Sequence, residues 1–195
     1  MTSRLSRAFR ALASALVLTA TLAPSWAGAS PLNALGLDPS LNLLSFGDFN
    51  AYYSDVQGRV AVGGNAAIQG YSVNLAYQGT QGPGLVVGGN LNFYNGTVWG
   101  DTLVGGNLTS NYSGAFTGNV FVGGNLNASQ GLSVGGGNKA YVSGSSVSIP
   151  GVNLPIAAAA APFDIGFDFA SEAVRLNALS DQLGIATPTG VVSDL

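Results

Sequence analysis

The stretch Leu85-Val86-Val87-Gly88-Gly89-Asn90-Leu91 (residues 85–91) contains the pattern that decides the fold. A short apolar run leads into a Gly-Gly-Asn tripeptide, and a second short apolar run starts directly after it. The same arrangement recurs at three further places: Gly63-Gly64-Asn65, Gly105-Gly106-Asn107 and Gly123-Gly124-Asn125. Gly136-Gly137-Asn138 is a fifth, less regular copy. An internal repeat is the first feature to explain, because it dictates the architecture.

The spacing of the copies predicts the size of one structural unit. Successive asparagines are 25, 17, 18 and 13 residues apart. The long first interval includes residues 78–84, which we interpret as a loop insertion, so the underlying period is about 17 to 18 residues. Three short strands and three turns of this total length form one coil of a β-solenoid, whereas a propeller blade is longer. We therefore predict an all-β, single-stranded parallel β-solenoid (β-helix) with coils over about 58–150.

The glycines and asparagines of the repeat suit the corners between strands. Glycine supplies the positive φ angles of sharp turns, and asparagine tolerates the same backbone region. In stacked coils we expect one asparagine above the next, each amide bonding to the next coil, in a turn ladder formed by Asn65, Asn90, Asn107 and Asn125. The alternative is that these asparagines only form turns.

Alternation along the strand before each tripeptide predicts which side chains face the core. Val62, Val87, Val104 and Val122 point inward on this pattern, and so do Val60, Leu85 and Val120, with Thr102 as the exception. The residues between them form an outward apolar column: Ala61, Val86, Leu103 and Phe121. An exposed apolar column needs a cover or a binding partner.

A helix at about 168–183 is the predicted cover. Apolar residues recur there at three- and four-residue steps, Asp168 can cap the first turn, and Gly184 can end the helix. We expect this C-terminal α-helix to pack alongside the solenoid and to bury the outward column. Residues 157–161 would form the connector that leads back to it.

The ends of the chain carry further expectations. Residues 1–29 read as a secretory signal peptide, with three arginines, an apolar run and Ala27-Gly28-Ala29 as a cleavage signal, an uncleaved anchor being the alternative. Residues 30–195 then form the domain, with 30–57 as its irregular first strand and cap, and with a last coil after Asn138. The final residues resemble a strand that stops, which suggests a C-terminally incomplete chain.

Composition excludes several classes of function. The sequence has no His and no Cys, so the common zinc sites, Ser-His-Asp triads and cysteine nucleophiles are excluded. After removal of residues 1–29, three basic residues face nine acidic ones, which gives a net charge of −6 and no basic patch for nucleic acid. We expect no cofactor, no catalytic residues and no metal site, although a single calcium near Asp48 or Asp55 stays open.

Aromatic residues are the best candidates for binding. Tyr94, Trp99 and Tyr112 combine a flat apolar ring with a polar tip, which suits contacts with sugars or proteins. The alternative for Trp99 is packing within or beside a coil.

Several of these motifs carry a family resemblance. The order of 46–50 (FGDFN), 54–65 (SDVQGRVAVGGN), 85–91 (LVVGGNL) and Phe167-Asp168-Phe169 resembles the choice-of-anchor A family of bacterial surface proteins. The resemblance covers most of 42–185 and implies a β-helical, adhesin-like domain displayed on the cell surface, with no catalytic residues. Some members are labelled collagen binders. The chain after residue 185 lacks a sorting motif, which fits a truncated chain or a short secreted form.

Together these observations predict a secreted or cell-surface adhesin-like binding module that is not an enzyme. Its partner would be an extracellular matrix protein or a glycan, bound through flat solenoid faces, with no nucleic acid and no membrane span after signal cleavage. Three alternatives stay open: an ice-binding protein, a structural component of an envelope or matrix, and a polysaccharide-processing enzyme.

Overall fold

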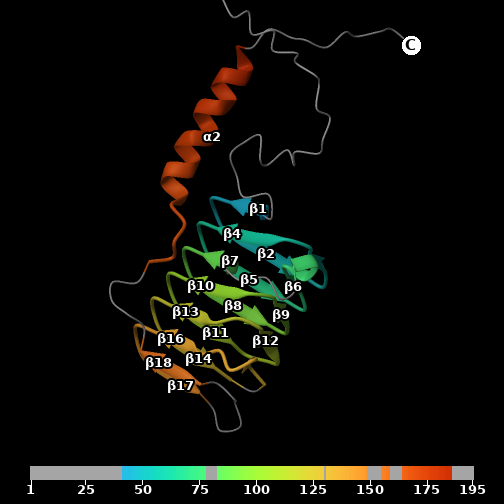
Figure 1. Ribbon diagram of the computed structural model, residues 1–195, viewed down its shortest axis with the longest axis vertical. Coiled ribbons are helices and arrows are strands. Elements are labelled where there is room, and N and C mark those ends of the chain that lie inside the picture. Colours follow the sequence, from blue (N-terminus) through green and yellow to red (C-terminus); the bar gives the residue numbers. More distant parts are fainter. Residues whose placement is uncertain (1–40, 78–82, 130, 149–154, 159–163, 186–195) are drawn as a thin grey trace, which may run out of the picture.

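The computed structural model describes residues 41–77, 83–129, 131–148, 155–158 and 164–185. In these residues the chain winds through a β-solenoid of six coils and ends in an α-helix, which confirms the predicted fold class (Figure 1). The predicted signal peptide at 1–29, the insertion at 78–82 and the final predicted strand lie outside the described residues.

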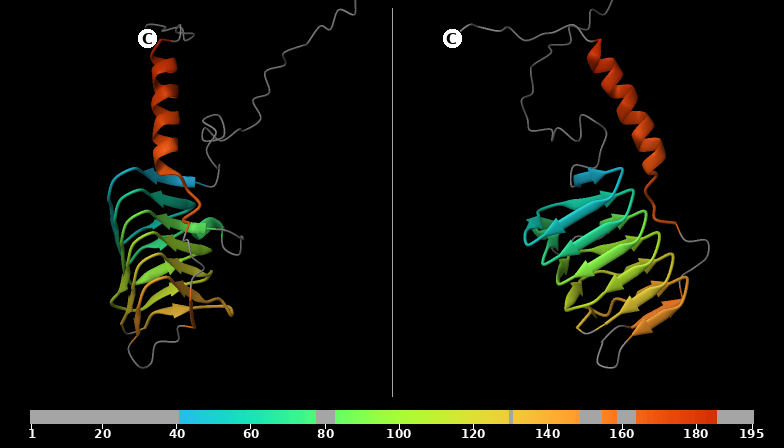
Figure 2. Two further views of the ribbon diagram at one scale, coloured as in Figure 1. Left: turned by 90° about the vertical axis from the view of Figure 1, so that its left-hand side faces the viewer. Right: turned by 180° about the vertical axis from the view of Figure 1, so that it is seen from behind.

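Three parallel sheets form the sides of the solenoid (Figure 2). Sheet A contains, in spatial order, β1 (Leu41–Ser45), β4 (Arg59–Val62), β7 (Pro83–Val87), β10 (Asp101–Val104), β13 (Val120–Val122), β16 (Ala140–Val142) and β18 (Ile156–Ala158). Sheet B contains β2 (Phe49–Tyr52), β5 (Ala66–Gln69), β8 (Leu91–Tyr94), β11 (Leu108–Ser110), β14 (Leu126–Ala128) and β17 (Ser146–Ser148). Sheet C contains β3 (Asp55–Val56), β6 (Ser72–Val73), β9 (Gly96–Val98), β12 (Gly114–Phe116) and β15 (Ser133–Val134). A 3-10 turn, η1 (Leu75–Tyr77), follows β6.

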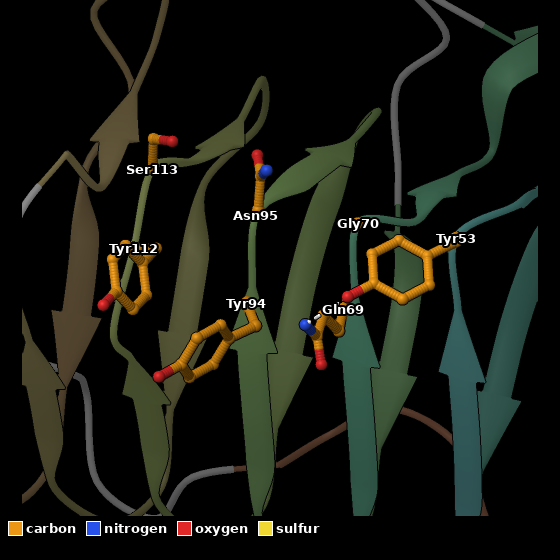
Figure 3. A pocket seen from close by; sticks show the side chains of 7 residues that line it. All are labelled: Tyr53, Gln69, Gly70, Tyr94, Asn95, Tyr112 and Ser113. Atoms are coloured by element: carbon orange, nitrogen blue, oxygen red, sulfur yellow. Dashed lines mark hydrogen bonds between the residues drawn. The ribbon is translucent and has the colours of Figure 1, made fainter.

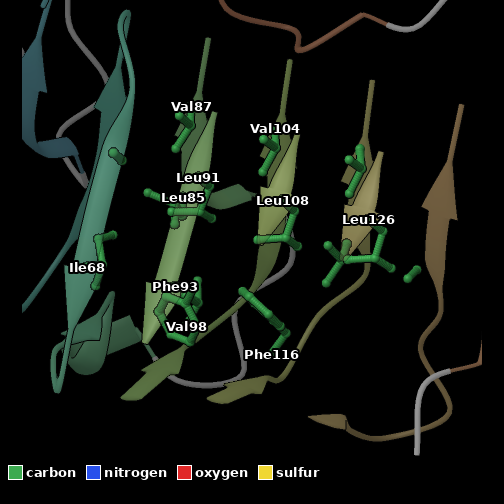
Figure 4. Packing of buried hydrophobic residues seen from close by; sticks show 14 of the residues in the cluster. Ile68, Leu85, Val87, Leu91, Phe93, Val98, Val104, Leu108, Phe116 and Leu126 are labelled. Atoms are coloured by element: carbon green, nitrogen blue, oxygen red, sulfur yellow. The ribbon is translucent and has the colours of Figure 1, made fainter. Parts of the chain in front are cut away.

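The core is a set of apolar columns that run along the solenoid axis. Coils stack in register, so that Val62 pairs with Val87 and Val104 with Val122. The predicted inward residues of sheet A are all buried, Thr102 included. Figure 4 shows the columns continuing through the leucines of sheet B to Phe93 and Phe116, whose ring centroids lie 4.9 Å apart. Burial of these side chains is the main stabilising contribution, at about 25 cal/mol per Å² of apolar surface.

The corners between sheets A and B are close-packed backbone. A Cβ added to Gly106 would lie 2.5 Å from Asn90 Oδ1 and 2.9 Å from the Gly89 backbone of the coil before. Gly106 N donates to Gly89 O at 2.9 Å. Glycine at this position therefore reflects the close approach of two coils, because a side chain would force them apart.

Coil 1 is more regular than predicted. Residues 41–56 contribute a strand to each sheet, where an irregular strand and cap were expected. Gly64 N donates to Gly47 O at 3.1 Å, which places Phe46-Gly47-Asp48 at the same corner as the Gly-Gly-Asn copies. Coil 1 was not predicted as a repeat, because in Phe46-Gly47-Asp48 only Gly47 matches the Gly-Gly-Asn tripeptide.

The fifth Gly-Gly-Asn copy is not a corner between sheets A and B. Val122 pairs with Val142, so Ser143-Gly144-Ser145 is the corner of coil 6, and Gly144 N donates to Gly124 O at 3.0 Å. Asn138 instead lies between sheets C and A, where its Nδ2 donates to Thr117 O at 2.7 Å. The spacing of 13 residues between Asn125 and Asn138, shorter than the regular 17 to 18, indicated that this copy lies at a different corner.

The helix α2 (Phe169–Gly184) forms as predicted, but it does not bury the outward column. None of its residues is buried, and it extends past β1 beyond the end of the solenoid (Figure 1). Part of the column is covered by the residues just before α2 and by its first residue, because Ile165, Phe167 and Phe169 pack against a cluster of Leu41, Ala61 and Val86. The predicted connector also differs, because Ile156–Ala158 pairs with β16 as the last strand of sheet A.

Candidate functional site

A ladder of asparagines follows the corner between sheets A and B. Asn65 Oδ1 accepts from Asn90 N at 2.9 Å, and Asn90 Oδ1 accepts from Asn107 N at 2.8 Å. Asn107 Oδ1 in turn accepts from Asn125 N at 2.8 Å. Each side chain therefore satisfies a backbone donor of the next coil while staying exposed to solvent.

Two residues outside the repeat extend this ladder. Asp48 Oδ1 accepts from Asn65 N at 2.7 Å, and Ser145 N donates to Asn125 Oδ1 at 2.8 Å. A second, shorter ladder lies between sheets C and A, where Asp101 Oδ1 accepts from Asn119 N at 2.8 Å and Asn119 Oδ1 accepts from Lys139 N at 3.1 Å. The glycines before Asp101 and Asn119 were the sequence signal for it.

Sheet B presents a flat outer face next to the asparagine ladder. Parallel register aligns one outward residue from each strand, and we call this column the B face: Asn50, Ala67, Asn92, Thr109, Asn127 and Val147. Val147 is 62% exposed, and the asparagines of the column are exposed too. The B face is thus a regular row of short side chains, four polar and two apolar, at strand spacing, about 4.8 Å.

At its edge toward sheet C, sheet B borders a shallow groove of about 280 Å³. We call it the tyrosine groove, and it is lined by Tyr53, Gln69, Gly70, Tyr94, Asn95, Tyr112 and Ser113. These residues lie at or just after the ends of β2, β5, β8 and β11, so that four successive coils contribute (Figure 3). The groove exists because the coils are in register at this corner.

The side chains of the groove are held by one another and by the backbone. Gln69 Nε2 donates to Tyr53 Oη at 2.8 Å (Figure 3). The ring centroids of Tyr94 and Tyr112 lie 5.1 Å apart, with an angle of 46° between the ring planes. Buried Ser110 donates through Oγ to the Tyr112 carbonyl at 3.4 Å. Such contacts restrict the rings before any ligand arrives.

The backbone at this corner is left-handed in three consecutive coils. Tyr53, Gly70 and Asn95 have φ of 51°, 57° and 58°. Glycine and asparagine adopt this region readily, whereas tyrosine rarely does. Gly70 is also constrained by space, because an added Cβ would lie 2.9 Å from Tyr53 Cδ1.

The three aromatic candidates are divided between two places. Tyr94 and Tyr112 line the tyrosine groove together, whereas Trp99 lies at the corner between sheets C and A. Trp99 N donates to Val73 O at 3.0 Å, and its carbonyl accepts from Asn74 Nδ2 at 2.9 Å. Gln69 also lines the groove, and the search for aromatic side chains missed it because its amide belongs to another residue class.

Several carboxylates of the described residues serve corners and caps. Asp48 and Asp101 belong to the two ladders. Asp168 caps α2 by accepting from Ser171 Oγ at 2.6 Å and from Ser171 N at 3.0 Å, and these hydrogen bonds lower the pKa of Asp168. Burial, followed by the nearby Asp55 charge, raises the pKa of Tyr71. In the part of the chain that the structure describes, no three His, Cys, Asp or Glu residues gather as metal ligands. The question whether a single calcium ion binds near Asp48 or Asp55 stays open.

The outer face of sheet A is covered at one end. Val86 is buried beneath the 165–169 segment, whereas Phe121 and Tyr141 further along are half-buried. Their rings stack, with centroids 5.0 Å apart and an angle of 10° between the ring planes.

The helices within the described residues are too short or too polar to cross a bilayer.

Comparison with known families assigns the chain. Residues 40–195 match the family model described as "Putative Ice-binding-like adhesive domain", which spans the solenoid and α2. Searches of curated proteins and of solved structures found no match. The adhesin-like part of the resemblance drawn from the sequence is thereby supported, while the choice-of-anchor A assignment stays a prediction. The chain belongs to the family of ice-binding-like adhesive domains.

Proposed function

We propose that the protein is a secreted or cell-surface adhesin-like module, non-catalytic, that binds an extracellular matrix protein, a glycan or another surface through its flat solenoid sides. The observation that carries this proposal is the B face, an aligned row of short side chains beside the asparagine ladder, of which the three asparagines are exposed. A rigid, regular face makes many shallow contacts without losing conformational entropy of its own. Membership of an adhesive-domain family supports the same role and an extracellular location.

Adhesion of coated beads tests the proposal. Beads that carry the full chain are washed over surfaces of collagen, fibronectin, neutral polysaccharide and ice, and the fraction retained is compared with beads that carry albumin. We expect retention on at least one surface. Albumin-like retention on every surface would refute an adhesive role.

Paired substitutions locate the face. Asn92→Glu with Asn127→Glu places two charges on the B face, and we expect retention to fall because desolvating these charges opposes contact. The matched control is Asn177→Glu with Ser180→Glu, which adds the same two charges at exposed positions of α2 and should adhere as the unaltered chain does. Equal loss in both variants would instead indicate a general charge effect.

Ice binding stays an alternative, because the family description names it. The B face contains one threonine, Thr109, and its other members are asparagine, alanine and valine. Thermal hysteresis measured on the same preparations separates adsorption to ice from adhesion to polymers.

A further inference from the structure

We propose that the tyrosine groove, at the edge of the B face, binds a neutral polysaccharide chain lying across the first four coils. This inference rests on the proposed binding role and names one ligand class for it. The groove is open along the solenoid axis, since its lining comes from consecutive coils (Figure 3). Tyr53 is 76% and Tyr112 57% exposed, so ring surface is available for contact.

The chemistry of the lining favours an uncharged, hydroxyl-rich ligand. Tyrosine rings offer flat apolar faces to the C–H side of a sugar ring, while their hydroxyl groups can donate and accept. Gln69 and Asn95 add amides, and Ser113 adds a hydroxyl. The residues that line the groove include no acid and no base, so neither an anionic nor a cationic polymer would find a counter-charge there.

Backbone strain at Tyr53 is the strongest single argument. The next two coils place Gly70 and Asn95 at this left-handed position, which are the residue types that adopt it at low cost. Coil 1 has tyrosine instead, although a ring so exposed contributes little to the core. Left-handed non-glycine residues that persist at a surface cleft point to a functional use of the side chain.

The shape of the groove suits an extended chain. Four coils span about 14 Å, because neighbouring strands lie about 4.8 Å apart. A peptide added as a strand would need free backbone groups at a sheet edge. At this corner Tyr53 N donates to Gln69 O at 2.9 Å and Gly70 N to Tyr94 O at 2.7 Å, so those groups are already paired.

The test measures binding of the full chain to insoluble cellulose, chitin and curdlan, and to soluble mannan and dextran, with alginate as an anionic comparison. We expect at least one neutral polysaccharide to bind and alginate not to. Tyr53→Asn and Tyr112→Ser should each weaken binding about tenfold, the change that corresponds to losing one aromatic contact. The matched control for Tyr112 is Tyr52→Asn, which removes a ring of the same exposure, 56% against 57%, that does not line the groove.

Thermal unfolding separates a binding role from a structural one. Because asparagine tolerates the left-handed region, Tyr53→Asn should unfold at the same or a higher temperature while it binds more weakly. No binding to any neutral polysaccharide, or full affinity in both groove variants, would overturn the inference. If beads still adhere to protein surfaces in that case, the proposed adhesive role stands and only the glycan assignment fails.

Discussion

At the scale of single residues, the asparagine ladder shows how a side chain replaces a missing backbone partner. At a corner the strand ladder is interrupted, so the N–H of the asparagine has no carbonyl directly above it. The Oδ1 of the asparagine one coil earlier takes that place, at 2.8 Å between Asn107 and Asn125. Asp48 performs the same task on coil 1, which shows that the acceptor oxygen is the required feature.

Substitution of Asn107 tests this requirement. Asn107→Ala removes the acceptor for Asn125 N, and we expect the free energy of unfolding to fall by about 1 kcal/mol, as for loss of one solvent-accessible hydrogen bond. Asn107→Asp keeps the oxygen and should retain most of the stability. Urea denaturation measures both variants, and an equal loss in the two would contradict the role of the oxygen.

At the scale of elements, the cover of sheet A comes from a short irregular segment. The side chains that reach Ala61 and Val86 come from residues 165–169, where Gly166 has a φ of 66° and turns the chain. Periodicity correctly predicted α2 but assigned the cover to its apolar stripe. Of that stripe, Phe169 at the start of α2 contacts the cluster, whereas Leu183 at the far end is 64% exposed.

Truncation of Phe167 tests the cover. Phe167→Ala should lower the free energy of unfolding by about 1–2 kcal/mol, less than a fully buried phenylalanine, because its ring is half-buried. Val174→Ala is the matched control and should leave stability unchanged, since its side chain is largely exposed. Denaturation curves that shift equally for both would show that α2 contributes as much as the covering segment.

At the scale of the whole molecule, each coil contacts chiefly its two neighbours. The strand pairs join consecutive coils throughout the three sheets. Stability in such a stack is close to a sum of coil and interface contributions, as in other repeat proteins. Coils at either end have one neighbour fewer than the coils in the middle.

Hydrogen exchange tests this gradient. We expect the slowest amide exchange in β7 to β12, which have coils on both sides, and faster exchange in β2 and β17 at the ends of sheet B. Mass spectrometry of peptic fragments resolves these segments. Uniform exchange across all coils would show instead that the solenoid opens as one cooperative unit.

The repeat length, the inward alternation and the corner residues were all predictable from the sequence, because each depends on chemistry local to a strand or a turn. A valine every second residue faces the same side wherever the strand lies. Gly-Gly-Asn likewise favours a tight corner in any coil. For this reason the solenoid and the stacking of its four regular Gly-Gly-Asn corners could be predicted from the sequence.

Only the tertiary structure decided which corners align and which side chains meet across coils. Ser145 and Asp48 complete the ladder although neither belongs to a Gly-Gly-Asn copy, and Asn138 belongs to one but lies at another corner. Tyr53 and Tyr112 are 59 residues apart in the sequence, yet both line one groove. Such proximity follows from the cumulative stacking of four coils, and loops of unequal length between them hide it from any fixed period.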